Sequence, residues 1–135
     1  MENSLQDENA NKVFENIELA LPVNAAYVSA AKQTAFSVAG RLGFDAQEAD
    51  DIKTAVSEAC VYIIKRQGTG TYKITFSMSS DHIHIRLGCP SEKRVEPTNG
   101  DYSLPLIKSL MDSVDILDGE GVFEIVMSKK QGEGG

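Results

Sequence analysis

Strict alternation of apolar and polar residues predicts five strands along the chain. Residues 13–22 alternate and are closed by a proline, which is typical of a strand that ends at a turn. Residues 71–79 and 82–89 form two further alternating runs separated by a short polar stretch, the pattern of a β-hairpin. Residues 115–130 contain two more such runs, joined around the glycines at 119 and 121.

A spacing of three to four residues between apolar side chains predicts three helices, at residues 24–44, 45–66 and 104–114. Asn24 is the expected N-cap of the first helix, and Asp45 with Glu48 forms a capping-box pattern at the start of the second. The strands bunch together and do not alternate singly with helices. The order therefore predicts an α+β fold, a two-layer α/β sandwich with helices on one face of a mostly antiparallel sheet.

Composition limits the domain organisation and the classes of partner. The chain has 135 residues, enough for one domain with a real core. Residues 13–130 are expected to form that domain, with a disordered acidic tail at residues 1–12 and a flexible tail at 131–135. The net charge of -7 argues against nucleic-acid and anionic-membrane binding. With no signal peptide or membrane-spanning run recognised, we expect a cytoplasmic protein.

The residues that most often bind metals do not combine into a metal site. Cys60 and Cys89 lack metal-ligand spacing and are interpreted as small buried thiols in a reducing compartment. His82 and His84 share one face of a strand, but no Cys, Asp or Glu has the spacing to complete a site with them. No metal site is predicted.

One carboxylate lies in the least polar part of the second predicted helix. Glu58 is flanked by the apolar stripe of that helix, beside Thr54, Ala55 and Tyr62. Burying a carboxylate is costly unless it is paired or solvated. Periodicity alone favours a boundary residue that reaches water or a lysine over a general base at the lip of a pocket.

Two stretches, "DIKTAVSEAC" (residues 51–60) and "LPLIKSLMDSV" (residues 104–114), together with the order of elements, resemble a known family. They are similar to the anti-sigma factor serine kinases of the RsbW/SpoIIAB type, in the GHKL superfamily, whose ATP-binding domain has the Bergerat fold. The resemblance extends from about Ile17 to Lys130. It implies that Glu58 corresponds to the catalytic base that activates a serine of a partner protein.

The nucleotide-binding positions depart from the family pattern. The resemblance places Tyr62 where an asparagine coordinates magnesium, and a phenol is a poor ligand for this hard cation. Cys89 stands where an aspartate accepts from the adenine amino group, and Ser91 where a glycine allows close approach. Glu58 would then be a base retained without its magnesium ligand, hydrogen-bonded locally, for example to Tyr62.

The glycine-rich lid, which holds phosphates in the family, is also altered. Only Gly100 remains of three glycines, while Asp101 and Ser103 replace the others and Pro105 follows. Asp101 would place negative charge beside a triphosphate. Three independent departures predict a degenerate site without nucleotide or magnesium, and a protein that is not an active enzyme.

The resemblance implies protein binding as the function. The expected partner is a sigma factor or another member of a partner-switching circuit, and the resemblance also implies a homodimer. The first alternative is an active serine kinase that uses ATP and magnesium to phosphorylate an anti-sigma factor antagonist. The second is a dimeric scaffold or sensory module.

The first predicted helix is expected to carry the partner contact. Lys32 corresponds to a basic residue that the family uses to bind sigma factors, although an arginine is more usual there. Ala31, Ala35 and Ala39 are expected to pack on the second helix. The remaining small face is expected at the partner interface, namely Ala26 and Ala30 together with Gln33 and Lys32.

Overall fold

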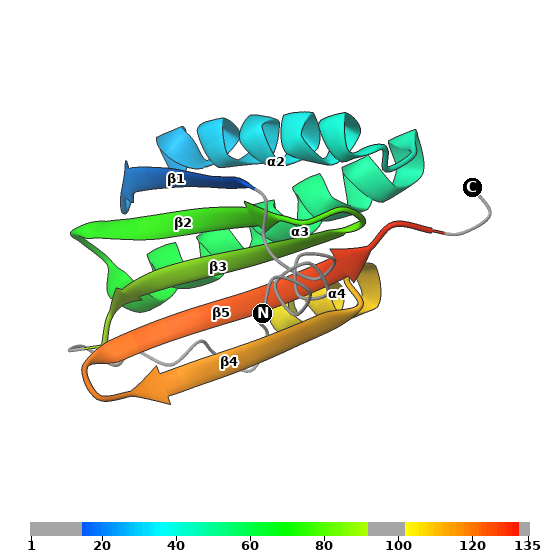
Figure 1. The fold of residues 1–135 in the computed structure, drawn as a ribbon. Helices are drawn as coiled ribbons and strands as arrows, with labels where there is room; N and C mark the ends of the chain where they lie inside the picture. Colours follow the sequence, from blue (N-terminus) through cyan, green and yellow to red (C-terminus); the bar gives the residue numbers. More distant parts are fainter. Residues whose placement is uncertain (1–14, 92–101, 133–135) are drawn as a thin grey trace, which may run out of the picture.

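The computed structural model describes residues 15–91 and 102–132, which form a five-stranded antiparallel sheet (Figure 1). The strands are β1 (Glu15–Pro22), β2 (Thr71–Met78), β3 (His82–Pro90), β4 (Ser113–Gly119) and β5 (Val122–Lys130). Their order in the sheet is β1-β2-β3-β5-β4, so that β1 and β4 are the two edges. Each neighbouring pair is antiparallel.

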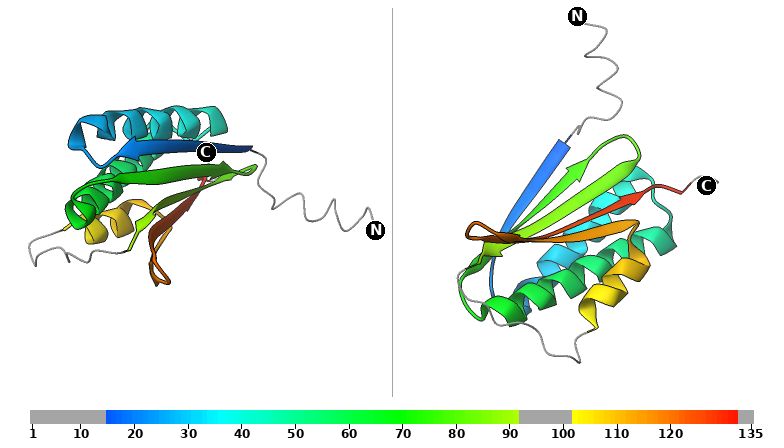
Figure 2. Two further views of the ribbon diagram at one scale, coloured as in Figure 1. Left: turned by 90° about the vertical axis from the view of Figure 1, so that its left-hand side faces the viewer. Right: turned by 90° about the horizontal axis from the view of Figure 1, so that it is seen from below.

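The helices lie together on one face of this sheet (Figures 1 and 2). They are the 3₁₀ turn η1 (Ala25–Tyr27) and the α-helices α2 (Val28–Leu42), α3 (Ala46–Gln67) and α4 (Ser103–Leu110). Figure 1 shows α2 next to β1 and α4 next to β5 and β4, with α3 between them. The arrangement confirms the predicted α+β sandwich with helices on one face.

Local sequence signals explain where α3 begins and where α2 ends. The carboxylate of Asp45 accepts from the backbone N–H of Glu48 at 2.8 Å, and the Asp45 N–H donates to the Glu48 side chain at 3.1 Å. This reciprocal pair is the predicted capping box, which satisfies two amides at the start of the helix. Gly43 ends α2 with a left-handed φ of 96°, a conformation that glycine adopts without steric cost.

The core lies between the sheet and α3. On the strands, alternate residues such as Ile74, Phe76 and Ile85 are fully buried, whereas their neighbours face the opposite side. The apolar stripe predicted for α3 packs on this face and is at most 2% exposed: Ala49, Ile52, Val56, Ala59 and Ile63. None of the helices in the described ranges has the length and apolar character needed to cross a membrane.

Two predicted boundaries were wrong. The third helix was expected over residues 104–114 but ends at Leu110, because the chain becomes extended at Met111 and the Asp112 N–H bonds the Ser128 carbonyl at 2.9 Å. Residues 113 and 114 therefore pair with β5 as part of β4. Asn24 does act as a cap, but it caps η1 through the Ala26 N–H, and α2 begins only at Val28.

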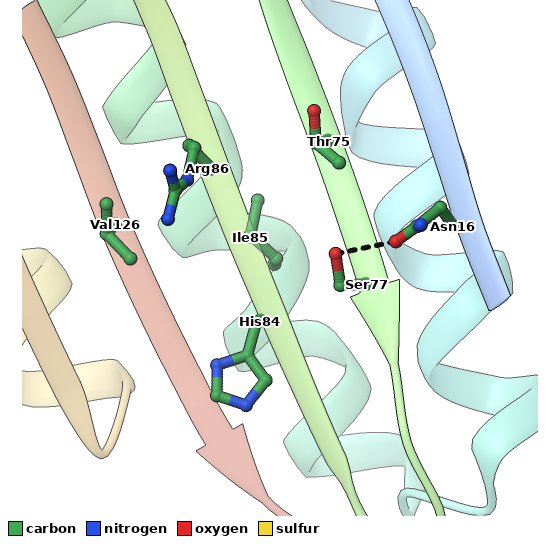
Figure 3. Close-up of a pocket in the computed structure, with 7 residues that line it drawn as sticks. All are labelled: Asn16, Thr75, Ser77, His84, Ile85, Arg86 and Val126. Atoms are coloured by element: carbon green, nitrogen blue, oxygen red, sulfur yellow. Dashed lines mark hydrogen bonds between the residues drawn. The ribbon is translucent and has the colours of Figure 1, made fainter. Parts of the chain in front are cut away.

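The opposite face of the sheet carries no helix of the described residues (Figure 2). The strand register aligns Asn16 with Ser77, Ser77 with His84, and His84 with Ser128 across this face. Short polar side chains leave a shallow groove of about 510 Å³ there, lined by Asn16, Thr75, Ser77, His84, Ile85, Arg86 and Val126 (Figure 3). The Ser77 hydroxyl donates to the Asn16 amide oxygen at 2.8 Å.

Candidate functional site

Glu58 connects α3 to the first turn of α4. The Ser103 hydroxyl donates to Glu58 Oε1 at 3.2 Å, and the Glu58 side chain is half-buried. Ser103 itself is only 5% exposed. The expected local partner of Glu58 was Tyr62, whereas the structure shows Ser103, 45 residues further along the chain, in this role. Two positions that the sequence placed at one site are thereby brought into contact.

Tyr62 lies one turn after Glu58 and its ring packs against the sheet. The ring stacks on Phe123 of β5, with centroids 6.0 Å apart and an interplanar angle of 14°. Tyr62 is 7% exposed and Phe123 is 1% exposed. An aromatic ring held in this way fills the position at which the resemblance puts a compact magnesium ligand, so the residue does not fit that ion.

Arg66, one further turn along α3, is a buried cation that sequence analysis missed. It is 1% exposed, and its guanidinium carbon lies 3.9 Å from the centre of the Phe123 ring. One guanidinium nitrogen donates to Asp118 Oδ2 at 2.9 Å. The other carboxylate oxygen of Asp118 accepts from the Ser91 hydroxyl at 2.7 Å. These contacts join the end of α3 to β4, β5 and the residue that follows β3.

Arg66 follows Glu58 and Tyr62 at intervals of four residues, and this spacing was the signal that could have found it. A buried arginine requires a compensating anion and further hydrogen bonds. Only the folded chain shows that Asp118, distant in sequence, supplies that anion. Ser91, at the position where the resemblance places a glycine close to the nucleotide, takes part in this network within the chain.

Cys89 belongs to β3 and faces the helices. It is 5% exposed, and burial raises the pKa of its thiol, with the Arg66 charge acting to lower the pKa and the Asp118 charge to raise it. A neutral thiol in this position is a weak acceptor and does not fit the amino group of adenine. Burial also raises the pKa of Cys60 to about 11, against a smaller lowering by a hydrogen bond to Tyr72. The interpretation of both residues as buried, free thiols is confirmed.

The remaining predicted site residues are not part of this cluster. Gly100 and Asp101 lie outside the described residues. His82 and His84 stack at 5.8 Å on the opposite face of the sheet, and His82 Nδ1 lies 2.9 Å from an Asp81 oxygen. Burial and the nearby His82 lower the pKa of His84. Within residues 15–91 and 102–132, no three potential metal ligands come together.

The predicted partner residues lie on and beside α2. Ala31, Ala35 and Ala39 are fully buried, as expected for the face that packs on α3. Ala30 and Gln33 are exposed on α2, and Ala26 is exposed in η1.

Lys32 is half-buried at the margin of the exposed face of α2 and lies one turn from Phe36, which is 44% exposed. Lys53 Nζ of α3 lies 5.5 Å from the centre of the Phe36 ring. The exposed aromatic ring of Phe36 thus lies beside the ammonium group of Lys53. Phe44, by contrast, lies in the core at 6% exposure.

An antiparallel sheet with helices on one face, and a site framed by α3, α4 and the ends of the inner strands, defines the histidine kinase-like ATPase fold. Residues 21–129 match the family described as "Histidine kinase-like ATPase domain". Taken with the relatives below, this match means that the chain belongs to the histidine kinase-like ATPase family, and within it to the RsbW type.

Two curated relatives are the serine-protein kinases RsbW of Bacillus mycoides (strain KBAB4) and Bacillus cereus (strain Q1). Each is 32% identical to this chain, over 86% of the chain and 85% of the relative. A solved structure of the RsbU and RsbW domains of a Mycobacterium tuberculosis protein is 12% identical, with a TM-score of 0.68. That match covers 87% of this chain but only 32% of the longer one, and it shows the fold alone.

Proposed function

We propose that this chain is an RsbW-type regulator that binds a partner protein without using a nucleotide. The observation that carries the proposal is the packing of Tyr62 and Arg66 against Phe123, with Arg66 paired to Asp118. Side chains that contact one another fill the region where the family resemblance would place magnesium and adenine. The buried thiol of Cys89 supports the same conclusion.

The exposed face of η1 and α2 supports the protein-binding part of the proposal. Surface helices of soluble proteins usually carry charged residues on the solvent face. Here the exposed residues from 25 to 40 are all uncharged: Ala25, Ala26, Tyr27, Ser29, Ala30, Gln33, Phe36, Ser37 and Gly40. Depletion of charge together with exposed aromatic rings is typical of the centre of a protein interface.

Charge at the border of this face indicates the kind of partner. Between Glu18 and Asp45 the chain contains two basic residues, Lys32 and Arg41, and no acidic residue. In a chain of net charge -7, this segment of the sequence carries a net positive charge. An acidic region of a sigma factor, or of a protein in the circuit that controls one, is therefore the partner that we propose.

Calorimetric titration with ATP and with ADP in the presence of magnesium tests the nucleotide part of the proposal. We expect no binding heat up to millimolar nucleotide, and no shift of the melting temperature in the same buffers. A micromolar dissociation constant would instead favour the second candidate, an active serine kinase. That candidate draws support from Glu58, which keeps a half-buried carboxylate at the position of the family's catalytic base.

A further inference from the structure

The β4 edge of the sheet concentrates exposed apolar side chains. Five of the eight large hydrophobic residues that are exposed in the described ranges belong to this end of the molecule: Tyr102, Leu106, Ile116, Leu117 and Val122. Ile116 and Leu117 lie on β4 itself, at 38% and 49% exposure, and point to opposite faces because they are consecutive in a strand. An apolar concentration of this kind marks an interaction surface more often than a monomer surface.

The backbone of β4 is available for pairing. Six of its seven residues are exposed, and among the described strands only β5 pairs with it (Figure 1). An edge strand presents unpaired N–H and C=O groups along its outer side, which form a template for another strand. The other edge strand, β1, has a single exposed large apolar residue, Ile17, and ends in a proline that lacks an N–H.

The charge around β4 indicates the sign of the charge that a partner segment would carry. Between Lys108 and Lys129 the chain has five acidic residues and no basic one: Asp112, Asp115, Asp118, Glu120 and Glu124. Asp118 is held by Arg66 and Glu124 lies 3.6 Å from Arg86, so that Asp112, Asp115 and Glu120 contribute most of the remaining negative charge. A second copy of the chain would bring a like-charged edge against this one, which disfavours self-pairing.

We propose that β4 binds an extended segment of a partner protein, in which basic side chains alternate with apolar ones, as a sixth strand of the sheet. Main-chain hydrogen bonds to the outer side of β4 would supply affinity, as in other cases of strand addition. Apolar residues of the segment would cover Ile116 on one face, and its basic residues would lie against Asp115 on the other. This surface is separate from α2, which lies at the opposite edge of the sheet (Figure 1).

A seven-residue peptide of alternating lysine and valine, capped at both ends, is the probe, and a glutamate–valine peptide of equal length is its control. In NMR titrations we expect the lysine peptide to shift the amide signals of residues 113–119 and to slow their hydrogen exchange. The glutamate peptide should leave these signals unchanged. Asp115→Lys should weaken binding of the lysine peptide by about tenfold.

Glu18→Lys makes the same charge change on β1 and should leave the affinity of the lysine peptide unchanged. An equal loss of affinity in both variants would mean that net charge alone attracts the peptide, and would overturn the proposal. Signal shifts confined to α2 would overturn it as well. The proposal would also be overturned if, without peptide, the β4 amides became more protected from hydrogen exchange as the protein concentration rises. A second copy of the chain would then be the occupant of this edge.

Discussion

The two edges of the sheet carry opposite surfaces. Beside β1, the exposed residues of α2 carry a single charge, that of Arg41, and the segment between Glu18 and Asp45 contains only basic charges. At β4, large apolar residues are exposed among acidic ones. The net charge of -7 is therefore unevenly distributed along the chain. Partners of different charge can be recognised at opposite ends of such a domain without competing for one surface.

Arg66 joins the end of α3 to the β4 side of the sheet, and its removal should have the largest effect. Arg66→Ala removes the guanidinium that Asp118 and Phe123 contact, and we expect a loss of about 3 kcal/mol in unfolding free energy. This is the low end of the range for a broken buried pair, because the Asp118 side chain is 27% exposed. Urea unfolding measures the loss, and hydrogen exchange should show β4 opening more readily than β1.

Arg86→Ala is the matched control for that substitution, since it removes an exposed arginine that lies 3.6 Å from a glutamate. Its cost should stay below about 1 kcal/mol. Equal losses for the two variants would contradict the role assigned to the buried network.

Charge reversal at Lys32 tests the α2 surface. We expect Lys32→Glu to weaken binding of the cognate partner by about 1 to 3 kcal/mol while the melting temperature barely changes. Lys73→Glu, on the opposite face of the sheet and 61% exposed, serves as the control and should bind normally. A binding isotherm beside a melting curve gives both quantities. Normal affinity of Lys32→Glu would place the partner interface elsewhere.

Glu58→Ala separates a structural carboxylate from a catalytic one. The substitution removes the acceptor of the Ser103 hydroxyl, so stability should fall by about 1 kcal/mol or less. Partner affinity should be unchanged, because Glu58 lies away from the exposed face of α2. Loss of the biological output with folding and partner affinity intact would show that Glu58 acts in catalysis.

The smallest expected effect concerns His84, midway between the two edges. Its pKa is lowered in the folded protein, so the unfolded chain binds more protons below its ordinary pKa, and stability should fall slightly as the pH drops through that range. The urea midpoint at pH 7.5 and at pH 5.5 measures this effect. In His84→Asn the difference between the two midpoints should shrink, and a larger difference would contradict the sign.

Local signals in the sequence were sufficient for most of the fold. Alternation located the strands, and the Asp45–Glu48 capping box located the start of α3. The end of α4 was predicted too late, because the apolar spacing continues through Val114 while the bond from Asp112 N–H to Ser128 draws the chain into β4. Pairing between distant segments decided that boundary, and a local pattern carries no information about it.

The candidate site was predictable in its positions but not in its contacts. A family pattern named four of its residues in advance, and these lie on separate segments of the chain: Glu58, Tyr62, Cys89 and Ser103. The Glu58–Ser103 bond and the stack of Tyr62 on Phe123 depend on how α3, α4 and β5 approach one another. Arg66 was missed for the same reason, since its anion is 52 residues away in the sequence.

The network of Arg66 also restricts how this chain can evolve. Placing a small amide at position 62 would remove a ring from Phe123, yet Arg66 and Asp118 would still occupy the space beside it. Replacing Arg66 first would remove the cation from a carboxylate that also holds Ser91. Each single step toward a magnesium ligand at this position is expected to pass through a less stable protein, so several substitutions would have to arise together. A buried ion pair of this kind therefore makes a magnesium site at this position difficult to gain by single substitutions.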